Sequence, residues 1–355
     1  MLSGIRIVEI EGLGPAPFAA MMLAELGAEV IVVHRRGAVA APNLLDRGKR
    51  SIALNLKDAG DAAVLCALIG TADGLIEGFR PGVMERLGFS PEACHAIRPR
   101  LVYGRMTGWG QDGPRAHQAG HDLNYIGLAG ALWHASLPGE PPLTPPTLVG
   151  DIGGGALYLV AGMLAGLLQA ARTGRGTVVD AAIVDGAAHM QALVLSLVPE
   201  GAALPRRGQG MLDGPHWSRS YACACGGHVA VQCLEPQFYA EFLARLGLSD
   251  DPAFARQHDP ATWPEATARL AGLFARHTRD HWTALFDGSD ACVAPVLSPE
   301  ASRADPHMAA RGTWAATPRL QPRAAPRFDG QVPADPPPPP ARDADGAAIR
   351  AELGL

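Results

Sequence analysis

Short apolar strands alternate with helical segments over the first 180 residues, and this alternation constrains the fold more than any other feature of the chain. Residues 5–10 alternate apolar and polar side chains as a half-buried strand does, and a Gly-Pro turn at 12–17 and a helix then lead to a second strand at 29–33. Further strands are expected at 51–56, 74–77, 101–106 and 177–182, with helices at 61–69, 84–87 and about 154–171. Because strand–helix–strand units form parallel sheets with right-handed crossovers, we predict an α/β fold around a parallel sheet.

The alternation stops at residues 199–220, where Gly, Pro and Arg become frequent. We therefore predict a large domain over 1–198, a linker over 199–220 and a smaller α+β domain over 221–317. Five consecutive prolines at 336–340 form a stiff spacer in the tail, 318–355, which we expect to rejoin the large domain; an SH3-type ligand is the alternative. The elements expected in the small domain are strands near 221–225 and 228–233 and helices near 236–246 and 266–277.

Composition excludes several classes of protein. The formal net charge of -5 argues against a general binder of nucleic acid or other polyanions. The longest apolar run, 152–168, contains five glycines, so we expect a buried helix packed through small residues and not a membrane span. The first residues show no secretory pattern, and we expect a cytoplasmic protein. Reduced thiols are expected for the six cysteines, at 66, 94, 223, 225, 233 and 292.

The turn after the first strand reads Gly12-Leu-Gly14-Pro-Ala-Pro17 and is close to the dinucleotide-binding pattern. It lacks the third glycine, and its prolines remove backbone donors that a pyrophosphate would need. We therefore do not favour a nicotinamide dinucleotide. The second strand ends in His34-Arg35-Arg36, and paired arginines over a turn suit adenine and phosphate.

A second basic cluster, Arg47-Gly-Lys49-Arg50, precedes the third strand. Its simplest interpretation is a solvated turn. Together with Arg35, Arg80 and Arg86 it would instead form the mouth of a site for a nucleotide with several phosphates. Both interpretations remain open from the residues alone.

Cys223-x-Cys225-x-x-His228, with Cys233 close behind, has some features of a metal site. The C-x-C spacing places both thiols on one face of a strand, and no second cysteine pair has metal-ligand spacing. We therefore expect core cysteines and no bound metal.

The polar stretch from Met106 to Gly155 carries the strongest signs of chemistry. Asp151 stands at an expected helix start, where it would serve as an N-cap or where the backbone N–H groups would hold an anion or an enolate oxygen. His121 lies in a glycine-flanked polar loop, a common place for catalytic residues. The residues alone leave catalysis and plain structural roles about equally open.

Five segments, 77–88, 106–125, 149–155, 178–186 and 234–239, carry the most specific resemblance to a known family. The chain resembles the α-methylacyl-CoA racemases of the family III CoA-transferase superfamily over most of its length. The resemblance implies a Rossmann-like large domain and an interlocked homodimer, with the site between the large domain of one chain and the small domain of the other. It also implies interconversion of (2R)- and (2S)-2-methylacyl-CoA thioesters through an enolate.

The resemblance also implies residue roles. His121 and Asp151 would be the two acid/base groups of a 1,1-proton transfer, Glu235 would pair with the histidine and Asp122 would support the site. The CoA thioester is the substrate, and no metal, flavin or nicotinamide is implied. The chain departs from the family at His34 and Arg36, near the adenine end. Positions matching the CoA and acyl site are Arg35, Leu54, Asn55, Leu56, Lys57, Gly78, Phe79, Arg80, Arg86, Gly120, Leu123, Asn124 and Tyr125.

Two alternatives differ in chemistry. In a family III CoA-transferase, Asp151 would attack the thioester and form an aspartyl anhydride, which a glycine-rich loop of the small domain would cover. Residues 222–228 contain only two adjacent glycines, which favours the racemase. A non-catalytic CoA-binding scaffold would not need His121, Asp151 and Glu235 together.

Overall fold

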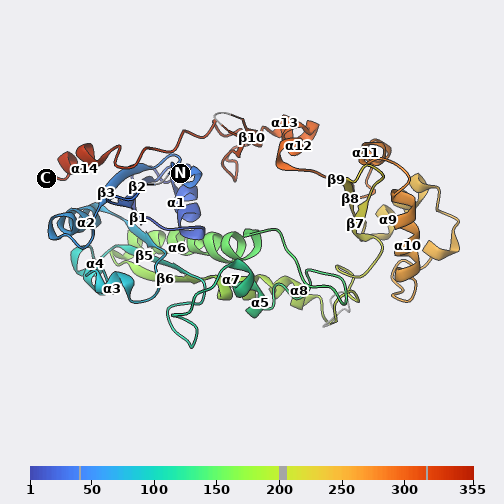
Figure 1. Ribbon diagram of the computed structural model, residues 1–355, viewed down its shortest axis with the longest axis horizontal. Helices are drawn as coiled ribbons and strands as arrows, with labels where there is room; N and C mark the ends of the chain where they lie inside the picture. Colours follow the sequence, from blue (N-terminus) through green and yellow to red (C-terminus); the bar gives the residue numbers. More distant parts are fainter. Residues whose placement is uncertain (40, 200–205, 317–318) are drawn as a thin grey trace. The chain divides into compact units, whose positions relative to one another are not determined.

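The computed structural model describes residues 1–39, 41–199, 206–316 and 319–355, which form two compact units (Figure 1). Unit 1 comprises Met1–Ala131, Pro145–Met190 and His307–Leu355, and unit 2 comprises Leu132–Thr144 and Gln191–Pro306. This partition differs from the predicted domain bounds, which gave 191–198 to the large domain and 307–317 to the small one. Part of the predicted linker, 200–205, and the predicted boundary at 317–318 lie outside the described residues.

Unit 1 is built on a six-stranded sheet in the order β3-β2-β1-β4-β5-β6, in which every neighbouring pair is parallel. The predicted parallel sheet is thus confirmed. The ends of all six strands lie within two residues of the expected positions, because the apolar pattern of a strand is a local signal. The strands are β1 (Arg6–Ile10), β2 (Glu29–Arg35), β3 (Arg50–Leu54), β4 (Gly74–Glu77), β5 (Val102–Thr107) and β6 (Thr177–Ala182).

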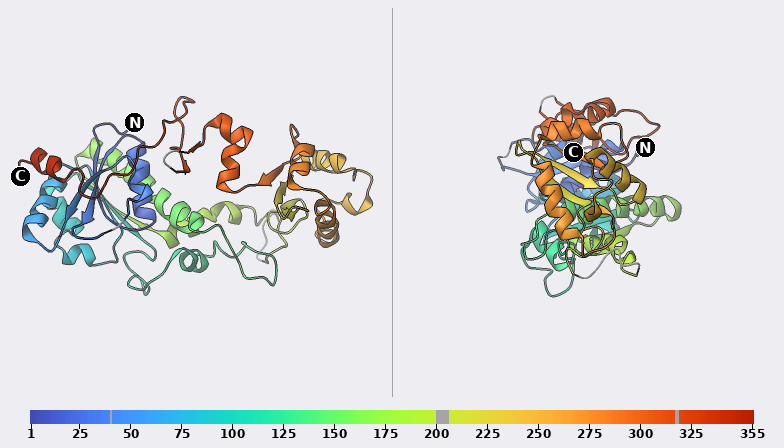
Figure 2. Two further views of the ribbon diagram at one scale, coloured as in Figure 1. Left: turned by 45° about the horizontal axis from the view of Figure 1, so that its top comes forward. Right: turned by 90° about the vertical axis from the view of Figure 1, so that its right-hand side faces the viewer.

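Helices cover both faces of this sheet (Figure 2). One apolar cluster joins α1 and α6 to one face, and a second joins α2, α4 and α14 to the other. The close approach of α6 to the sheet depends on two glycines. A Cβ on Gly162 would overlap Val179, and a Cβ on Gly166 would overlap Val102. The helices of unit 1 are α1 (Pro15–Glu25), α2 (Ala59–Thr71), α3 (Val83–Arg86), α4 (Pro91–Ile97), α5 (Asp122–Leu128), α6 (Leu157–Thr173), α7 (Ile183–Met190) and α14 (Gly346–Glu352), with α13 (Pro306–Arg311) beginning at the last residue of unit 2.

The predicted apolar helix has two parts. A π-helical segment, Leu148–Ala156, runs directly into α6, so the helix starts earlier than the expected residue 154. Among the described residues, Leu148–Thr173 is the one helix long and apolar enough to cross a membrane by length and composition, with a mean hydropathy of 1.6. Leu159, Val160 and Met163 nevertheless pack in the core of unit 1, as expected of a buried helix.

Unit 2 contains a three-stranded antiparallel sheet in the order β7-β8-β9, with an aromatic core that includes Trp217, Phe242 and Phe274. Cys223 and Cys225 lie in the turn between β7 and β8, where the Cys223 N–H donates to the Gly227 carbonyl at 2.8 Å. The strand expected at 221–225 therefore lies three residues earlier. The elements are β7 (Ser218–Ala222), β8 (His228–Gln232), β9 (Val293–Val296), α8 (Ala192–Ser196), α9 (Pro236–Leu246), a 3-10 turn (Pro252–Phe254), α10 (Trp263–Phe274), α11 (Arg279–Phe286) and α12 (Pro299–Ala304).

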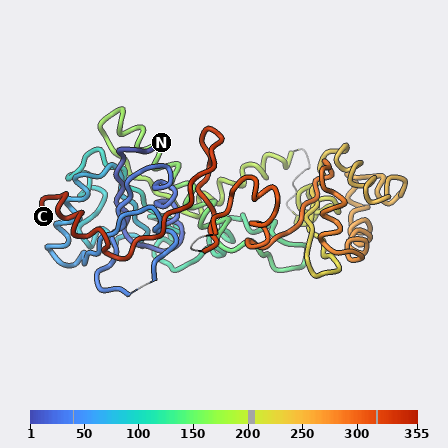
Figure 3. The backbone as a smooth tube through the Cα atoms, turned by 90° about the horizontal axis from the view of Figure 1, so that it is seen from above, coloured from blue at the N-terminus to red at the C-terminus, as the bar shows by residue number. Residues whose placement is uncertain are grey.

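The C-terminal tail packs on unit 1 and covers an edge of its sheet. It contains a two-stranded ribbon, β10 (Trp314–Ala315) with β11 (Gln321–Pro322), passes through the proline run and ends in α14 (Figure 3). Along β3, the carboxylates of Asp343 and Asp345 accept the N–H groups of Ala53 and Ser51, each at 2.8 Å. These bonds satisfy donors that an edge strand would otherwise expose.

Candidate active site

Asp151 lies in the first turn of the π-helical segment, not at its cap. Thr147 occupies the N-cap with a φ of 62°, and the Ile152 N–H donates to its carbonyl at 3.0 Å. The N–H groups of Gly150 and Asp151 both donate to Asp122 Oδ1, at 2.9 and 2.8 Å. The N-cap interpretation is therefore wrong, and the three N–H groups at this helix start are already bonded. The N–H groups of Gly150, Asp151 and Ile152 are therefore not free to hold an enolate oxygen.

Asp122 ties the start of α5 to the start of the π-helical segment. Its side chain is buried, and its other oxygen, Oδ2, has no hydrogen-bond partner among the described residues. Gly150 makes the contact possible, because a Cβ there would overlap Asp122 Oδ1 and lie 2.8 Å from Ile126 Cγ2. Asp122 thus fixes the backbone of Asp151. In the sequence, only the glycine at position 150 indicates this contact, because any other residue there would overlap the Asp122 side chain.

The electrostatics of Asp151 suit a group that changes protonation state. Burial raises the pKa of its carboxyl, the negative charge of Asp122 raises it further, and His121 partly offsets both effects. His121 is therefore close enough to Asp151 for its charge to affect the carboxyl, and both residues belong to unit 1. A carboxyl with a raised pKa can hold or release a proton near neutral pH more readily than an exposed aspartate.

His121 is the N-cap of α5 and its ring is exposed. Its backbone N–H donates to Asn124 Oδ1 at 3.0 Å, so Asn124 orients the residue that carries the imidazole. The turn between β1 and α1 also reaches this site: a Cβ on Gly14, where φ is 69°, would lie 3.7 Å from Asp151 Oδ2. Three separate segments therefore converge around Asp151.

An aromatic pair supports the loop before His121. The rings of Trp109 and Tyr125 meet edge to face with centroids 4.7 Å apart, and the Tyr125 hydroxyl donates to the Gly120 carbonyl. A Cβ on Gly108 or Gly120 would overlap the Tyr125 ring. Burial raises the pKa of Tyr125, as does Asp151, whereas Arg80 lowers it. Tyr125 thus serves as a buried support beside the site.

Most of the predicted CoA positions gather at the carboxyl ends of β2, β3 and β4. This is the edge at which open α/β sheets bind ligands. Leu54 is buried and faces the core, and Leu56 and Phe79 are half-buried. Leu123 and Asn124, on α5, are exposed. The exposed positions at the strand ends are Arg35, Asn55, Lys57, Gly78, Arg80 and, at the end of α3, Arg86.

The basic cluster before β3 is neither a solvated turn nor a phosphate site. The Lys49 side chain is 0% exposed, and its Nζ lies 2.5 Å from Glu9 Oε2 and 3.2 Å from the Pro17 carbonyl. Arg47 is also buried and binds Glu25 through Nε at 2.9 Å. Their partners come from β1 and α1, so both residues hold the core of unit 1 together.

Glu235 lies in unit 2 as the N-cap of α9, and its side chain is exposed. It stands near Cys292, whose pKa is raised by burial and by the charge of Glu235. His121 and Asp151 belong to unit 1, so the pairing of Glu235 with the histidine stays a prediction. No group of three or more His, Cys, Asp or Glu side chains that could hold a metal ion occurs within the described part of the chain.

Comparisons with known proteins show the family of the chain. Residues 2–346 match the CoA-transferase family III. The α-methylacyl-CoA racemase of Mus musculus is 42% identical over 316 residues, covering 88% of this chain and 82% of the mouse protein. The α-methylacyl-CoA racemase of Homo sapiens is 41% identical over 329 residues, covering 92% and 86% of the two chains.

A solved structure shows the same fold along nearly the whole chain. The crystal structure of a CAIB/BAIF family protein from Brucella suis superposes with a TM-score of 0.84 and 26% identity, covering 99% of each chain. The family match, the two relatives and the shared fold lead to one conclusion. The chain belongs to the CoA-transferase family III.

Proposed function

We propose that this protein is an isomerase, a racemase that interconverts (2R)- and (2S)-2-methylacyl-CoA thioesters. The observation that supports the proposal is the setting of Asp151, a partly buried carboxyl whose pKa is raised by burial and by Asp122 and lowered by His121. Two relatives at 42% and 41% identity bear the name of this activity. Racemisation needs two groups that exchange a proton with one carbon, and this pair supplies them.

The reaction breaks and remakes one C–H bond. One group of the pair takes the α-proton, and the electrons of that bond move into the thioester carbonyl to form an enolate. The other group, which must then be protonated, delivers its proton to the opposite face of the same carbon. The roles exchange for the other enantiomer, so His121 and Asp151 must hold opposite proton states at the start. No cofactor is needed beyond the CoA of the substrate.

The carboxyl edge of the sheet supplies the CoA site. Arg35, Lys57, Arg80 and Arg86 are exposed there, and their positive charges suit the phosphates of CoA. Arg35 is the last residue of β2, Lys57 and Arg80 follow β3 and β4, and Arg86 is the last residue of α3.

A homodimer would complete the site, with Glu235 supplied by the second chain. The resemblance to the family implies this arrangement, and Glu235 belongs to a different unit from His121. Co-expression of His121→Ala with Glu235→Gln tests it. If each site takes His121 from one chain and Glu235 from the other, every hybrid dimer has one intact site, and roughly a quarter of the activity returns. A site built within one chain would leave the mixture as inactive as the variants.

The six cysteines are free thiols. This agrees with the cytoplasmic location that we propose, because reducing compartments keep thiols free. Fractionation of the source cells, with the protein detected by antibody, checks the location; recovery in a secreted or membrane fraction would contradict it.

Incubation of one enantiomer of a 2-methylacyl-CoA in deuterated water tests the activity. We expect deuterium at the α-carbon together with loss of optical purity. Asp151→Asn and His121→Ala should each remove exchange more severely from one enantiomer than from the other, because each removes a different base. Transfer of CoA to an added free acid without α-exchange would contradict the racemase and indicate a transferase that works through an Asp151 anhydride.

A further inference from the structure

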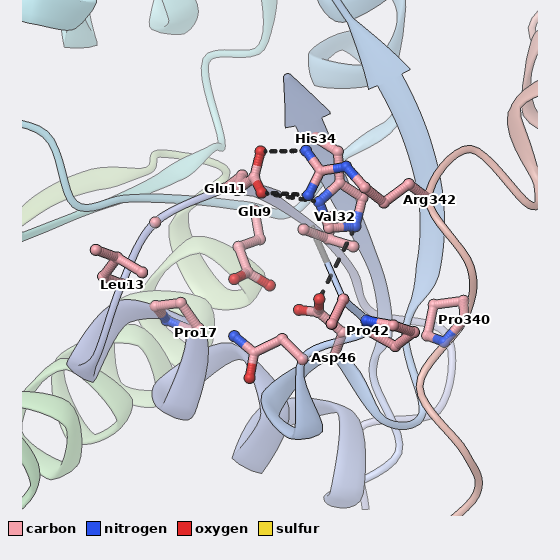
Figure 4. Close-up of a pocket in the computed structure, with 13 residues that line it drawn as sticks. Glu9, Glu11, Leu13, Pro17, Val32, His34, Pro42, Asp46, Pro340 and Arg342 are labelled. Carbon is pink, nitrogen blue, oxygen red and sulfur yellow. Dashed lines mark hydrogen bonds and ion pairs between the residues drawn. The ribbon is translucent and has the colours of Figure 1, made fainter. Parts of the chain in front are cut away.

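The C-terminal tail brings Arg342 to the end of β2, where it meets Glu11 (Figure 4). Arg342 Nη1 lies 2.6 Å from Glu11 Oε1, and Nη2 lies 2.8 Å from Oε2. Two parallel bonds of this kind fix both the distance and the orientation of an arginine and a carboxylate. The tail is thus held at one defined point beside the sheet.

Both members of this pair also bind the backbone of Arg35. Glu11 Oε2 accepts the Arg35 N–H at 2.8 Å, and Arg342 Nη2 donates to the Arg35 carbonyl at 3.3 Å. The reason lies in the sheet. The Glu11 N–H makes a last ladder bond to the Val33 carbonyl at 3.0 Å, and β1 then leaves β2. The side chains of Glu11 and Arg342 therefore bind the N–H and carbonyl groups of Arg35 in place of a neighbouring strand.

On its other side, β2 remains joined to β3, because the Arg36 N–H donates to the Leu54 carbonyl at 3.0 Å. The backbone of Arg35 is held from both sides, while its guanidinium extends from an exposed position. An arginine with a fixed backbone and a free head loses less conformational entropy when it binds a phosphate than one on a mobile turn.

The charges around Glu11 keep its contact with Arg342 intact at neutral pH. Partial burial by itself would raise the pKa of Glu11, but the bonds from Arg342 and the Arg35 N–H, together with His34, lower it to about 2. Glu11 is therefore ionised at neutral pH. His34 Nδ1 lies 3.4 Å from Glu11 Oε1, and behind it a cavity of about 300 Å³ reaches Asp46 and Pro340 (Figure 4).

We propose that Arg342 is a positioning residue for CoA binding, acting with Glu11 to hold Arg35 toward the phosphates of CoA. This inference rests on the proposed function, because it takes the ligand at Arg35 to be a CoA thioester. It adds that the affinity for CoA depends on the docked tail, a segment 307 residues away from Arg35 in the sequence. The effect should fall on binding and leave the proton transfer unchanged.

Arg342→Gln tests the inference, with Arg342→Lys as the conservative variant. We expect Arg342→Gln to raise KM for the acyl-CoA by roughly tenfold and to weaken binding of CoA itself, measured by calorimetry, by a similar factor. Its kcat should stay within about twofold of the wild type. Arg342→Lys keeps one charge and should recover part of the loss.

Arg323→Gln is the matched control. Arg323 also lies in the tail and binds Asp335 through Nε at 2.9 Å and the Trp314 carbonyl at 2.9 Å. If it weakens CoA binding as strongly as Arg342→Gln, general loosening of the tail explains the effect and the inference is overturned.

The double variant Arg35→Ala/Arg342→Gln gives the most decisive test. When Arg35 is already absent, Arg342→Gln should weaken CoA binding no further, because coupled residues are not additive. Full additivity, or an unchanged CoA affinity in Arg342→Gln, would overturn the inference. Absence of α-proton exchange in the wild type would instead contradict the proposed function, and calorimetry with CoA would still decide the role of Arg342.

Discussion

Replacing Asp122 with alanine should destabilise unit 1 more than a change at any exposed carboxylate. The substitution removes the shared acceptor of two N–H groups, on Gly150 and Asp151, which lie 2.9 and 2.8 Å from Asp122 Oδ1. A hydrogen bond to a charged group contributes about 1.5–3 kcal/mol, so the pair contributes about 3–6 kcal/mol. This is a large share of the roughly 5–15 kcal/mol that a domain has in total.

Asp122→Asn separates the geometric effect from the electrostatic one. A neutral carbonyl at the place of Oδ1 keeps about 0.5–1.5 kcal/mol per bond, so about 2–3 kcal/mol should be lost. Removing the Asp122 charge also lowers the pKa of Asp151, because that charge helps to raise it. In the proposed reaction Asp151 acts as a base only when ionised, so the limb of the pH–rate profile that reports its ionisation should move to lower pH.

Urea unfolding followed by circular dichroism measures the first effect, and kcat/KM for each enantiomer against pH measures the second. Asp112→Asn, at an exposed position, is the matched control. Equal urea midpoints for Asp122→Ala and Asp112→Asn would refute the argument from the two hydrogen bonds. A shift of the Asp122→Asn limb to higher pH would refute the electrostatic argument.

Three further outcomes are expected. Burial raises the pKa of Glu9 from 4.5 to about 7, so its stabilising contribution is present below the lower value and lost as pH rises through the higher one. The urea midpoint of the wild type should therefore fall as pH rises from about 5 to 8, and Glu9→Gln should reduce this fall. If the variant shows the same dependence on pH as the wild type, other groups cause the fall. Alanine at Gly186 would overlap the Gly154 carbonyl and should cost about 1–3 kcal/mol or more in thermal unfolding. Gly272 has open space around it, so Gly272→Ala should be neutral or stabilise unit 2 by up to about 1 kcal/mol. A larger destabilisation by Gly272→Ala than by alanine at Gly186 would contradict the argument from packing. The Cys225 thiol is exposed, and backbone N–H groups lower its pKa, so iodoacetamide should label it first, as mass spectrometry can show.

Local patterns account for the part of the fold that the sequence predicts well. The strands β4 and β6 and the helix α9 have the predicted bounds, 74–77, 177–182 and 236–246. Each is delimited by its own apolar period and by a glycine or proline at one end or both. The helix that contains Asp151 was expected near 154 and begins at Leu148. Its start is held by Asp122, and no local pattern reports a bond between residues 29 apart.

The burial of the charged residues Arg47 and Lys49 could not be predicted from the sequence for the same reason. Arg47 and Lys49 stand in a turn with the composition of a solvated surface. Their partners, Glu25 and Glu9, come from α1 and β1, and only the packed unit brings them together. Family resemblance pointed to His121 and Asp151, but it did not indicate that backbone contacts from Asp122 and Asn124 orient them.

The same kind of hydrogen bond occurs at both positions to which we propose a function, Asp151 and Arg35. Asp122 accepts the N–H of Asp151, and Glu11 accepts the N–H of Arg35. In each case a regular ladder of backbone bonds begins or ends at that point, and a carboxylate from another element takes the place of the missing acceptor. The functional residue then has a fixed backbone and a side chain free to meet the substrate. Amide variants of Asp122 and Glu11 keep an acceptor and remove the charge, whereas alanine variants remove both. Comparing the two kinds of variant at each position therefore separates the effect of geometry from the effect of charge.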